Sequence, residues 1–306
     1  MSHVLSLIAA PAKSLLEKAD AGHACRVLAA AGARSAAPDW LAEGEACEIP
    51  FAGCEPAQAL HCARAAFADR AVDVNVLPRA SRRKRLLLAD MDSTLIEQEC
   101  IDELAAQIGV GAEVAAITER AMRGDIAFEP ALRERVALLA GLPEETAARV
   151  LARRITIRPG ARTLVATMRA AGVRTALVSG GFTLFAEPIG RAIGFDEVRA
   201  NRLIAANGLF TGEVAHPILG AAAKEEALAE LSGRLGLDSA DTLAVGDGAN
   251  DLGMIRRAGL GVAFHAKPTL REAAGAVIDH ADLTALLFLQ GYRRAEFTAT
   301  PPVPRI

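Results

Sequence analysis

The sequence predicts an α/β protein with a doubly wound, mostly parallel sheet, an inserted helical cap and a small α+β unit in front of them. Three observations predict this fold class. Short apolar runs recur from residue 86 onward, and a helical pattern follows each one, as in parallel sheets. Residues 97–155 are almost wholly helical in pattern, which indicates an insertion directly after the first run. Residues 1–80 form a separate compositional unit that mixes strands and helices.

The bulk properties exclude several classes of protein. A chain of 306 residues suits two domains. The net charge of −3 argues against a general nucleic-acid binder. No run reaches the roughly 18 apolar residues of a membrane span, and the start lacks a basic signal-peptide region, so we expect a cytoplasmic protein. The five cysteines include no C-x-x-C pair, which indicates reduced thiols and no zinc site.

The first 80 residues, here called the N-terminal unit, show five elements by their periodicity. We expect strands at Val4–Ala9, Glu45–Phe51 and Ala71–Leu77, and helices at Ala12–Ala31 and Pro56–Asp69. Two roles remain open for this unit. It resembles small regulatory ligand-binding domains in its succession of elements, or it is an appendage that stabilises the chain or pairs two copies into a homodimer.

A basic run, Arg79–Arg85, joins the N-terminal unit to the rest of the chain. We interpret it as a solvated linker, with a phosphate-steering patch as the alternative. Beyond it, strands and helices alternate. The expected elements are strand 86–90, helix 160–171, strand 175–179, helix 183–193, a hairpin around Asn207-Gly208, helix 221–235, strand 242–246, helix 251–258, strand 261–264 and a helix near 282–289.

Two aspartates, Asp90 and Asp92, directly follow the apolar run Leu86–Ala89. Ligands bind open α/β sheets at the carboxyl ends of the strands, and side chains at i and i+2 of an extended chain share a side. Two close carboxylates are unfavourable without a cation, so the pair indicates a raised pKa or a bound metal. The structural alternative is a strand-end aspartate followed by an Asx turn or a helix cap with Ser93 and Thr94.

Two further candidates lie later in the chain. The turn Ser179-Gly180-Gly181 ends an apolar run, and its hydroxyl and approachable N–H groups suit a phosphate or an oxyanion. The same tripeptide is common in ordinary turns between a strand and a helix. Lys224 opens the predicted helix 221–235, against the preference set by the helix dipole. It is therefore either required at that position or simply a solvated side chain.

The strongest of the later patterns is Val245–Asp251, where a predicted strand ends in a glycine-flanked aspartate. Asp247, Asn250 and Asp251 place three oxygen-bearing side chains within about one helical turn, which suits a hard cation such as Mg²⁺. The alternative is a turn of glycine, aspartate and asparagine without a ligand. All these patterns fall at strand ends or helix starts, so we expect them to share one edge of one sheet.

Taken in order, Asp90–Thr94, Ser179, Lys224 and Gly246–Asp251 resemble the four motifs of the haloacid dehalogenase superfamily of aspartate-dependent phosphatases. The resemblance covers roughly residues 84–290. It implies a Rossmann-like core formed by residues 84–99 and 156–290, a helical cap at 100–155 and a C-terminal tail at 291–306.

Within that superfamily the chain resembles the phosphoserine phosphatase family. The resemblance rests on Glu99–Glu103, Ile117–Gly124 with Phe128, Leu132–Val136, Ser179–Phe182, Ala200–Arg202 and Phe264–Pro268. It implies hydrolysis of O-phospho-L-serine to L-serine and phosphate, the last step of serine biosynthesis. The implied partner is this small substrate, with neither nucleic acid nor membrane.

The resemblance also implies catalytic roles. Asp90 would be the nucleophile that forms an aspartyl-phosphate. Asp92 would be the general acid and base, which requires a raised pKa. One Mg²⁺ would be held by the Asp90 carboxylate, the Asp92 carbonyl and Asp247. Asp251 would orient the water shell of the metal or Lys224.

The remaining roles concern the substrate. Ser179, the Gly180 N–H, Lys224 and Asn250 would surround the phosphoryl group. From the cap, Glu99 would bind the substrate ammonium, Arg135 its carboxylate, and Phe128 and Met122 would line the wall that excludes water. The alternative is that Glu99 and Arg135 are ordinary exposed charges on helices without a role in binding. Three histidines receive no role, namely His216, His265 and His280.

Two rival functions remain open from the residues alone. The first is a phosphatase or phosphotransferase for another small phosphomonoester, such as phosphohomoserine. The second is a receiver-type signalling module, which also gathers carboxylates around Mg²⁺ and phosphorylates an aspartate. Asp92 and the helical insertion argue against the receiver.

Overall fold

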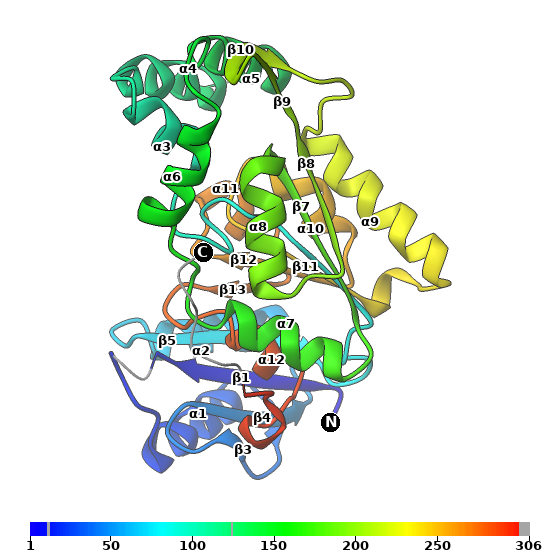
Figure 1. Ribbon diagram of the computed structural model, residues 1–306. Helices are drawn as coiled ribbons and strands as arrows, with labels where there is room; N and C mark the ends of the chain where they lie inside the picture. The colour runs from blue at the N-terminus through cyan, green and yellow to red at the C-terminus, as the bar shows by residue number, and fades with distance from the viewer. Residues whose placement is uncertain (11–12, 124, 300–306) are drawn as a thin grey trace.

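The computed structural model describes residues 1–10, 13–123 and 125–299, without the side chains of residues 122 and 123 (Figure 1). The N-terminal unit forms an antiparallel sheet of its own, in the order β2-β4-β1-β5 with β3 paired to β4. Its elements are β1 (His3–Ala9), α1 (Lys18–Ala30), β2 (Arg34–Ser35), β3 (Asp39–Ala42), β4 (Ala46–Ala52), α2 (Pro56–Ala66) and β5 (Val72–Pro78).

Both faces of this small sheet are buried. Leu5 and Leu7 of β1 pack under α1 and α2. Val4 and Ile8 point the other way and join the large core cluster that contains α12 (Ala285–Leu289). Successive side chains of a strand point to opposite faces, so β1 binds its own helices with one face and the rest of the protein with the other.

The central sheet has six parallel strands in the order β13-β12-β11-β6-β7-β8. The strands are β6 (Leu86–Ala89), β7 (Arg174–Phe182), β8 (Glu197–Asn201), β11 (Thr242–Gly246), β12 (Leu260–Phe264) and β13 (Ala276–Ile278). The order runs outward from β6 in both directions along the sheet, which is the doubly wound arrangement that the sequence predicts.

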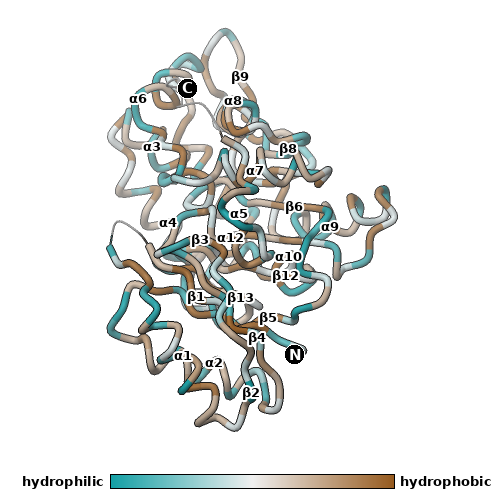
Figure 2. Tube along the Cα trace, turned by 90° about the horizontal axis from the view of Figure 1, so that it is seen from below, coloured by the Kyte–Doolittle hydropathy of each residue, from teal (hydrophilic) through white to brown (hydrophobic). Residues whose placement is uncertain are grey.

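Helices cover both faces of the central sheet. Leu87 and Ala89 of β6 face the cluster with α7 (Ala161–Ala170) and α8 (Thr183–Ile193). Leu86 and Leu88 face the opposite cluster, with α9 (Ala221–Leu235), α10 (Leu252–Arg257) and α11 (Pro268–Ala273). The hydropathy colouring of Figure 2 shows apolar segments concentrated on the strands between these helices. The continuous apolar run of β6 thus reflects burial on both sides.

The cap contains α3 (Cys100–Ala106), α4 (Gly111–Arg123), α5 (Phe128–Ala137) and α6 (Glu145–Arg154). The hairpin of β9 (Leu203–Ala206) and β10 (Leu209–Val214) extends from the core to join them (Figure 1). Phe210 exchanges backbone hydrogen bonds with the α5–α6 turn, from Gly141 N to Phe210 O at 2.8 Å and from Phe210 N to Leu142 O at 2.9 Å. Positive φ values at Asn207 and Gly208 confirm the predicted tight turn.

Several element boundaries differ from the prediction. Within the described residues, the first helix begins at Lys18, and strand β7 continues past Ser179 to Phe182. Strands β2, β3, β8 and β13 and helix α11 were not predicted, since they are short or, like β8, lie at a half-exposed sheet edge with a polar sequence. Among the described helices, none has the length and apolar character needed to cross a bilayer.

The interpretation of the basic run as a solvated linker is wrong for two of its members. Arg82 pairs with Glu48 of β4 and donates to the carbonyl of Leu289 at the end of α12, 2.9 Å away. The Nζ of Lys84 is buried and donates to the carbonyl of Ala240 at 2.6 Å. Carbonyls at a helix end lack intrahelical partners and attract cations, so the basic run fastens the two parts of the protein together.

Candidate active site

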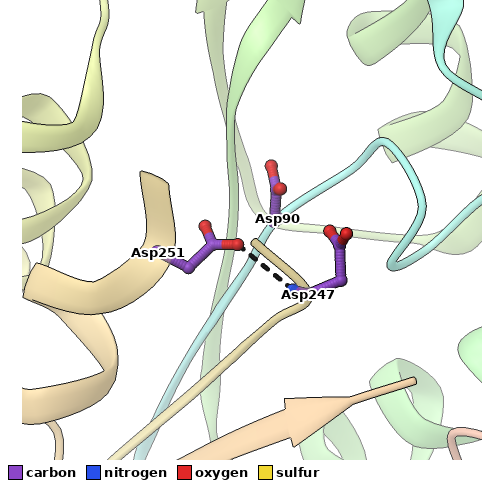
Figure 3. Close-up of side chains that lie close together, drawn as sticks. All are labelled: Asp90, Asp247 and Asp251. Carbon is purple, nitrogen blue, oxygen red and sulfur yellow. Dashed lines mark hydrogen bonds between the residues drawn. The ribbon is translucent and has the colours of Figure 1, made fainter. Parts of the chain in front are cut away.

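Three carboxylates meet at the carboxyl edge of the central sheet. Asp90 follows β6, Asp247 follows β11, and Asp251 ends the short 3₁₀ turn Ala249–Asp251 that leads into α10 (Figure 3). One oxygen from each of them lies within 4.8 Å of the others. The structure therefore brings together the first and last of the four sequence patterns, which are more than 150 residues apart.

Lys224 places the third pattern in the same cluster. Its Nζ lies 2.6 Å from Asp90 Oδ1 and 2.7 Å from Asp251 Oδ1, and its side chain is buried. Burial alone would lower the pKa of Lys224, but the carboxylates of Asp251 and Asp90 outweigh it, so that the pKa is raised and the ammonium stays charged. The solvated alternative for this lysine is thereby excluded.

Asp251 holds the loop at one side of the cluster. Its Oδ2 accepts a hydrogen bond from the Asp247 N–H at 3.2 Å (Figure 3) and one from the Gly248 N–H, also at 3.2 Å, and its Oδ1 accepts from Lys224. A Cβ at Gly246 would overlap this carboxylate, which explains why a glycine precedes Asp247. Both oxygens of Asp251 are engaged by protein groups, as expected for a residue that orients Lys224.

The cluster carries more negative than positive charge. Burial and Asp251 raise the pKa of Asp90 well above its ordinary value, although Lys224 opposes the shift. Burial, Asp251 and Glu99 raise the pKa of Asp247 to about 6. Thr94, which sequence analysis left without a role, donates from its buried hydroxyl to Asp247 Oδ1 at 3.2 Å.

These observations fit a divalent cation. Three buried carboxylates face one ammonium group, so the site is short of positive charge. Carboxylate and carbonyl oxygens are the donors that hard divalent ions prefer. Asp90 and Asp247 have oxygens available for such an ion, whereas those of Asp251 are already engaged.

Asp92 lies beside Asp90, half-buried against the second pattern. A Cβ at Gly181 would come within 2.8 Å of Asp92 Oδ2, so this carboxyl lies directly over the end of β7. Burial and the nearby Glu99 raise the pKa of Asp92 to about 7, although a long hydrogen bond from Cys100 N, at 3.4 Å, opposes the shift. The raised pKa agrees with the sequence-based expectation for a general acid.

Ser179 and Gly180, near the end of β7, form a braced cradle. Ser179 is buried, and its Oγ accepts from Gly181 N at 2.9 Å. Asn201 of β8 donates to the carbonyls of Gly180 at 2.8 Å and Leu219 at 3.0 Å. It thereby ties the cradle to the loop before α9. Asn201 lies in one of the segments that carry the family resemblance, and nothing in its local pattern predicts this bridging position.

Phe128 is the cap residue that lies directly over the cradle. A Cβ at either Gly180 or Gly220 would come within 3.1 Å of its ring. The ring therefore lies above both walls of the phosphate cradle, where two glycines leave room for it. This placement is consistent with the predicted role in excluding water.

The other cap residues are arranged more loosely. Glu99 is exposed and accepts from Ser93 Oγ at 2.7 Å. Arg135 donates to Ala131 O at 3.3 Å and to Thr118 Oγ1 at 3.4 Å. Burial lowers the pKa of Arg135, whereas the nearby carboxylates of Asp102, Glu99 and Asp92 act to raise it. The guanidinium group therefore has acidic neighbours. Asp102 is a neighbour that sequence analysis missed.

Two candidates remain. The side chain of Met122 lies outside the described residues. Asn250 is half-buried in the 3₁₀ turn, and its Oδ1 would lie 2.6 Å from a Cβ at Gly248, which places it against the glycine loop. Its predicted contact with the phosphoryl group stays a prediction, as do the individual roles of the other site residues.

Comparison with known proteins agrees with this geometry. The family model of haloacid dehalogenase-like hydrolases matches residues 87–256, which include every carboxylate of the cluster. The chain belongs to this family. The match includes the whole cap, whereas the N-terminal unit and the residues after 256 lie outside it.

Individual relatives of this haloacid dehalogenase-like hydrolase extend the match. Phosphoserine phosphatase SerB2 of Mycobacterium tuberculosis is 46% identical over 234 residues, which cover 76% of this chain and 57% of that protein. This chain thus spans little more than half of that relative. A phosphoserine phosphatase of Albidiferax ferrireducens is 46% identical, with 67% of this chain and 89% of that protein covered.

A solved structure covers nearly the whole chain. The HAD family hydrolase from Salmonella enterica serovar Typhi has a TM-score of 0.81 and 27% identity, and it covers 94% of this chain and 97% of its own. The likeness therefore includes the N-terminal unit as well as the hydrolase core.

Proposed function

We propose that this protein is a Mg²⁺-dependent phosphomonoesterase that hydrolyses O-phospho-L-serine to L-serine and phosphate, as the last step of serine biosynthesis. One observation carries the proposal. Asp90 is buried, paired with Lys224 at 2.6 Å and adjacent to Asp247, at the edge of the sheet under a cap. The relatives named phosphoserine phosphatase, at 46% identity, support the choice of substrate.

The reaction has two steps at Asp90. Its carboxylate oxygen attacks phosphorus, and the serine oxygen departs with a proton from Asp92, which leaves an aspartyl-phosphate. Asp92, now ionised, takes a proton from water as that water attacks the phosphoryl group. Phosphate leaves, the Asp90 carboxylate is restored, and Asp92 is protonated again. A carboxyl with a pKa of about 7 suits both proton transfers near neutral pH.

Most of the rate enhancement must come from charge stabilisation. Enzymes accelerate phosphate-monoester hydrolysis by up to about 10²¹-fold, whereas one acid–base group supplies roughly 10²–10⁴. Lys224, Ser179 Oγ and the Gly180 N–H would hold the phosphoryl oxygens. Mg²⁺, held by the carboxylates of Asp90 and Asp247 and the Asp92 carbonyl, would neutralise charge on the same oxygens.

The cap would select the substrate. Glu99 would bind the ammonium group and Arg135 the carboxylate of phosphoserine, while Phe128 closes the site over the phosphoryl group. Asn250 would contact the phosphoryl group from the glycine loop. The acidic surroundings of Arg135, with Asp102 among them, support its being held toward the site.

We also propose the division of the chain that the sequence predicts, with the cap at 100–155 inserted between core segments 84–99 and 156–290, and a tail at 291–306. The hairpin of β9 and β10 belongs to the cap by its contacts, although it lies in a core segment. A homodimer formed through the N-terminal unit stays a prediction, which light scattering of the purified chain would check.

Steady-state kinetics with and without Mg²⁺ tests the proposal. We expect hydrolysis of L-phosphoserine that depends on the metal, with phosphohomoserine and sugar phosphates turned over far more slowly. Equal rates on all three substrates would leave a phosphatase but contradict the specificity. A stable phospho-aspartate without turnover would instead support the receiver-type module.

A further inference from the structure

The N-terminal unit contacts the central sheet at one edge. Strand β5 of the small sheet lies beside β13 (Figures 1 and 2). Asn75 of β5 forms two hydrogen bonds with the backbone of Val277 in β13, from Asn75 Nδ2 to Val277 O at 2.9 Å and from Val277 N to Asn75 Oδ1 at 2.8 Å. The amide of Asn75 thus substitutes for a neighbouring strand and fixes the position of β13.

Asp73, two residues earlier on β5, holds the turn that follows β13. Its buried carboxylate accepts from the N–H groups of Asp279 at 2.7 Å, His280 at 3.1 Å and Ala281 at 2.9 Å. Three convergent N–H donors make a strong and directional site for a carboxylate. The conformation of turn 279–281 therefore depends on a side chain from the N-terminal unit.

The turn at residues 279–281 holds His265. The Nε2 of His265 donates to the carbonyl of Ala281 at 3.1 Å, and the backbone N–H of His265 donates to Ile278 O at 2.7 Å. The φ of His265 is +47°, a left-handed conformation that is uncommon outside glycine. Such a conformation persists where its surroundings fix it, and these two hydrogen bonds join His265 to the end of β13 and to the turn after it.

The loop beyond His265 reaches the active site. Two residues later, Lys267 N donates to the carbonyl of Asp247 at 2.9 Å. Asp247 is thus held from two sides, with its carboxylate bound by Thr94 and its carbonyl by this loop. Hydrogen bonds thus connect Asp73 to Ala281 and Ala281 to His265, two residues of backbone lead on to Lys267, and a last hydrogen bond reaches Asp247.

We propose that Asp73 and His265 are positioning residues for Asp247, so that the N-terminal unit sets the affinity of the active site for its divalent cation. This inference rests on the proposed function, which makes Asp247 a metal ligand. Asp73 and His265 contact neither substrate nor metal. Residues that orient a metal ligand tune its affinity through geometry.

Calorimetric titration of the full-length protein with Mg²⁺ tests the proposal without relying on turnover. We expect Asp73→Ala and His265→Asn each to weaken Mg²⁺ binding by about fivefold, with the KM for phosphoserine at saturating Mg²⁺ within about twofold of wild type. Asparagine tolerates the left-handed conformation but is too short to reach Ala281 O, so His265→Asn isolates the lost hydrogen bond.

Asn75→Ala is the matched control, because it loosens the same contact with β13 without touching the turn. We expect it to lower the unfolding temperature while Mg²⁺ affinity stays near wild type. Asp73→Asn keeps one acceptor oxygen and should recover part of the affinity. If Asp73→Ala does not fold, His265→Asn and Asp73→Asn decide the matter.

Unchanged Mg²⁺ affinity in folded Asp73 and His265 variants would overturn the proposal. An equal loss in Asn75→Ala would also overturn it, since the effect would then be a general loosening of the contact. Wild-type protein that binds Mg²⁺ but does not hydrolyse phosphoserine would contradict the proposed function alone. Wild-type protein that binds no Mg²⁺ would contradict both.

Discussion

The floor of the site and the wall above it are built differently. The floor residues are buried and held by short hydrogen bonds or ion pairs, and they are Asp90, Ser179, Lys224 and Asp247. The wall residues are half-buried or exposed, and they are Glu99 just before α3 and Phe128 and Arg135 in the cap. Glu99 and Arg135 bond to Ser93 and Thr118, outside the floor, and Phe128 packs over the cradle. The floor is preorganised, whereas the wall is arranged to adapt.

This difference suggests a division of roles, with catalysis assigned to the floor and choice of substrate to the wall. Under the proposed function, the preorganised charged floor would act on the phosphoryl group, which is common to all phosphomonoesters. The wall is free to contact the group that is unique to each substrate, and to move as substrate enters. Substitutions in the floor should therefore reduce turnover of every substrate, and substitutions in the wall should change the preference among them.

The largest effect is expected at the nucleophile. Asp90→Asn removes the attacking carboxylate and should lower kcat by about 10⁴-fold or more, for phosphoserine and for other phosphomonoesters alike. It also relieves repulsion with Asp251 and Asp247, because the pKa of Asp90 is raised by Asp251 after burial. We therefore expect the thermal unfolding temperature not to fall much. A loss of activity that merely parallels unfolding would contradict the role.

The general acid comes next. Asp92→Asn should lower kcat/KM by roughly 10²–10⁴-fold. Because the folded pKa of Asp92 lies near 7, well above its ordinary value, the wild-type carboxyl holds its proton up to that pH and loses it above. We expect kcat/KM of wild type to fall about tenfold per pH unit above the pKa. This fall should be absent in Asp92→Asn, and a fall that persists there would assign it to another group.

Substitutions in the wall should change the preference among substrates. Arg135→Ala removes the proposed partner of the substrate carboxylate, a charge-assisted contact worth roughly 10–100-fold. Phosphoethanolamine lacks that carboxylate, so the variant should lose activity toward phosphoserine and retain it toward phosphoethanolamine. Lys224→Ala is the floor counterpart and should impair both substrates. Equal losses on both substrates in Arg135→Ala would break the distinction between floor and wall.

The smallest effects are expected on stability, for one glycine in the hairpin that joins the cap and one in α9. Gly208→Ala places a side chain at φ +78°, which should cost about 1 kcal/mol of unfolding free energy. Gly233→Ala, in the exposed part of α9 with open space around it, should instead stabilise by about 0.5–1 kcal/mol. Urea unfolding measures both. Opposite signs are expected, with kcat/KM little changed in either variant.

The floor could be predicted from the sequence because strand ends and their order are local features. The apolar run of β6 and the glycine-flanked Asp247 each mark the end of a buried strand, and parallel strands bring these ends to one edge. The family resemblance then supplied roles that residue patterns alone left open, above all for Lys224.

Contacts between distant segments could not be predicted in this way. Asp73 and Asn75 lie in an alternating strand, and nothing near them indicates that they bind the backbone of residues 277–281. Likewise, the hairpin at 203–214 gives a strong turn signal but no sign that it joins the cap. Local periodicity determines which faces are buried, whereas the partner across a contact depends on the assembled fold.

The basic run has a practical consequence for limited digestion. Five arginines and lysines between residues 79 and 85 would ordinarily make a preferred site for trypsin. Here Arg82 in the middle of the run binds Glu48 of the N-terminal unit and, on the other side, the carbonyl of Leu289. A protease must draw an extended stretch of chain into its cleft, so cleavage at this junction should await detachment of the N-terminal unit, and its rate would report how often that unit detaches.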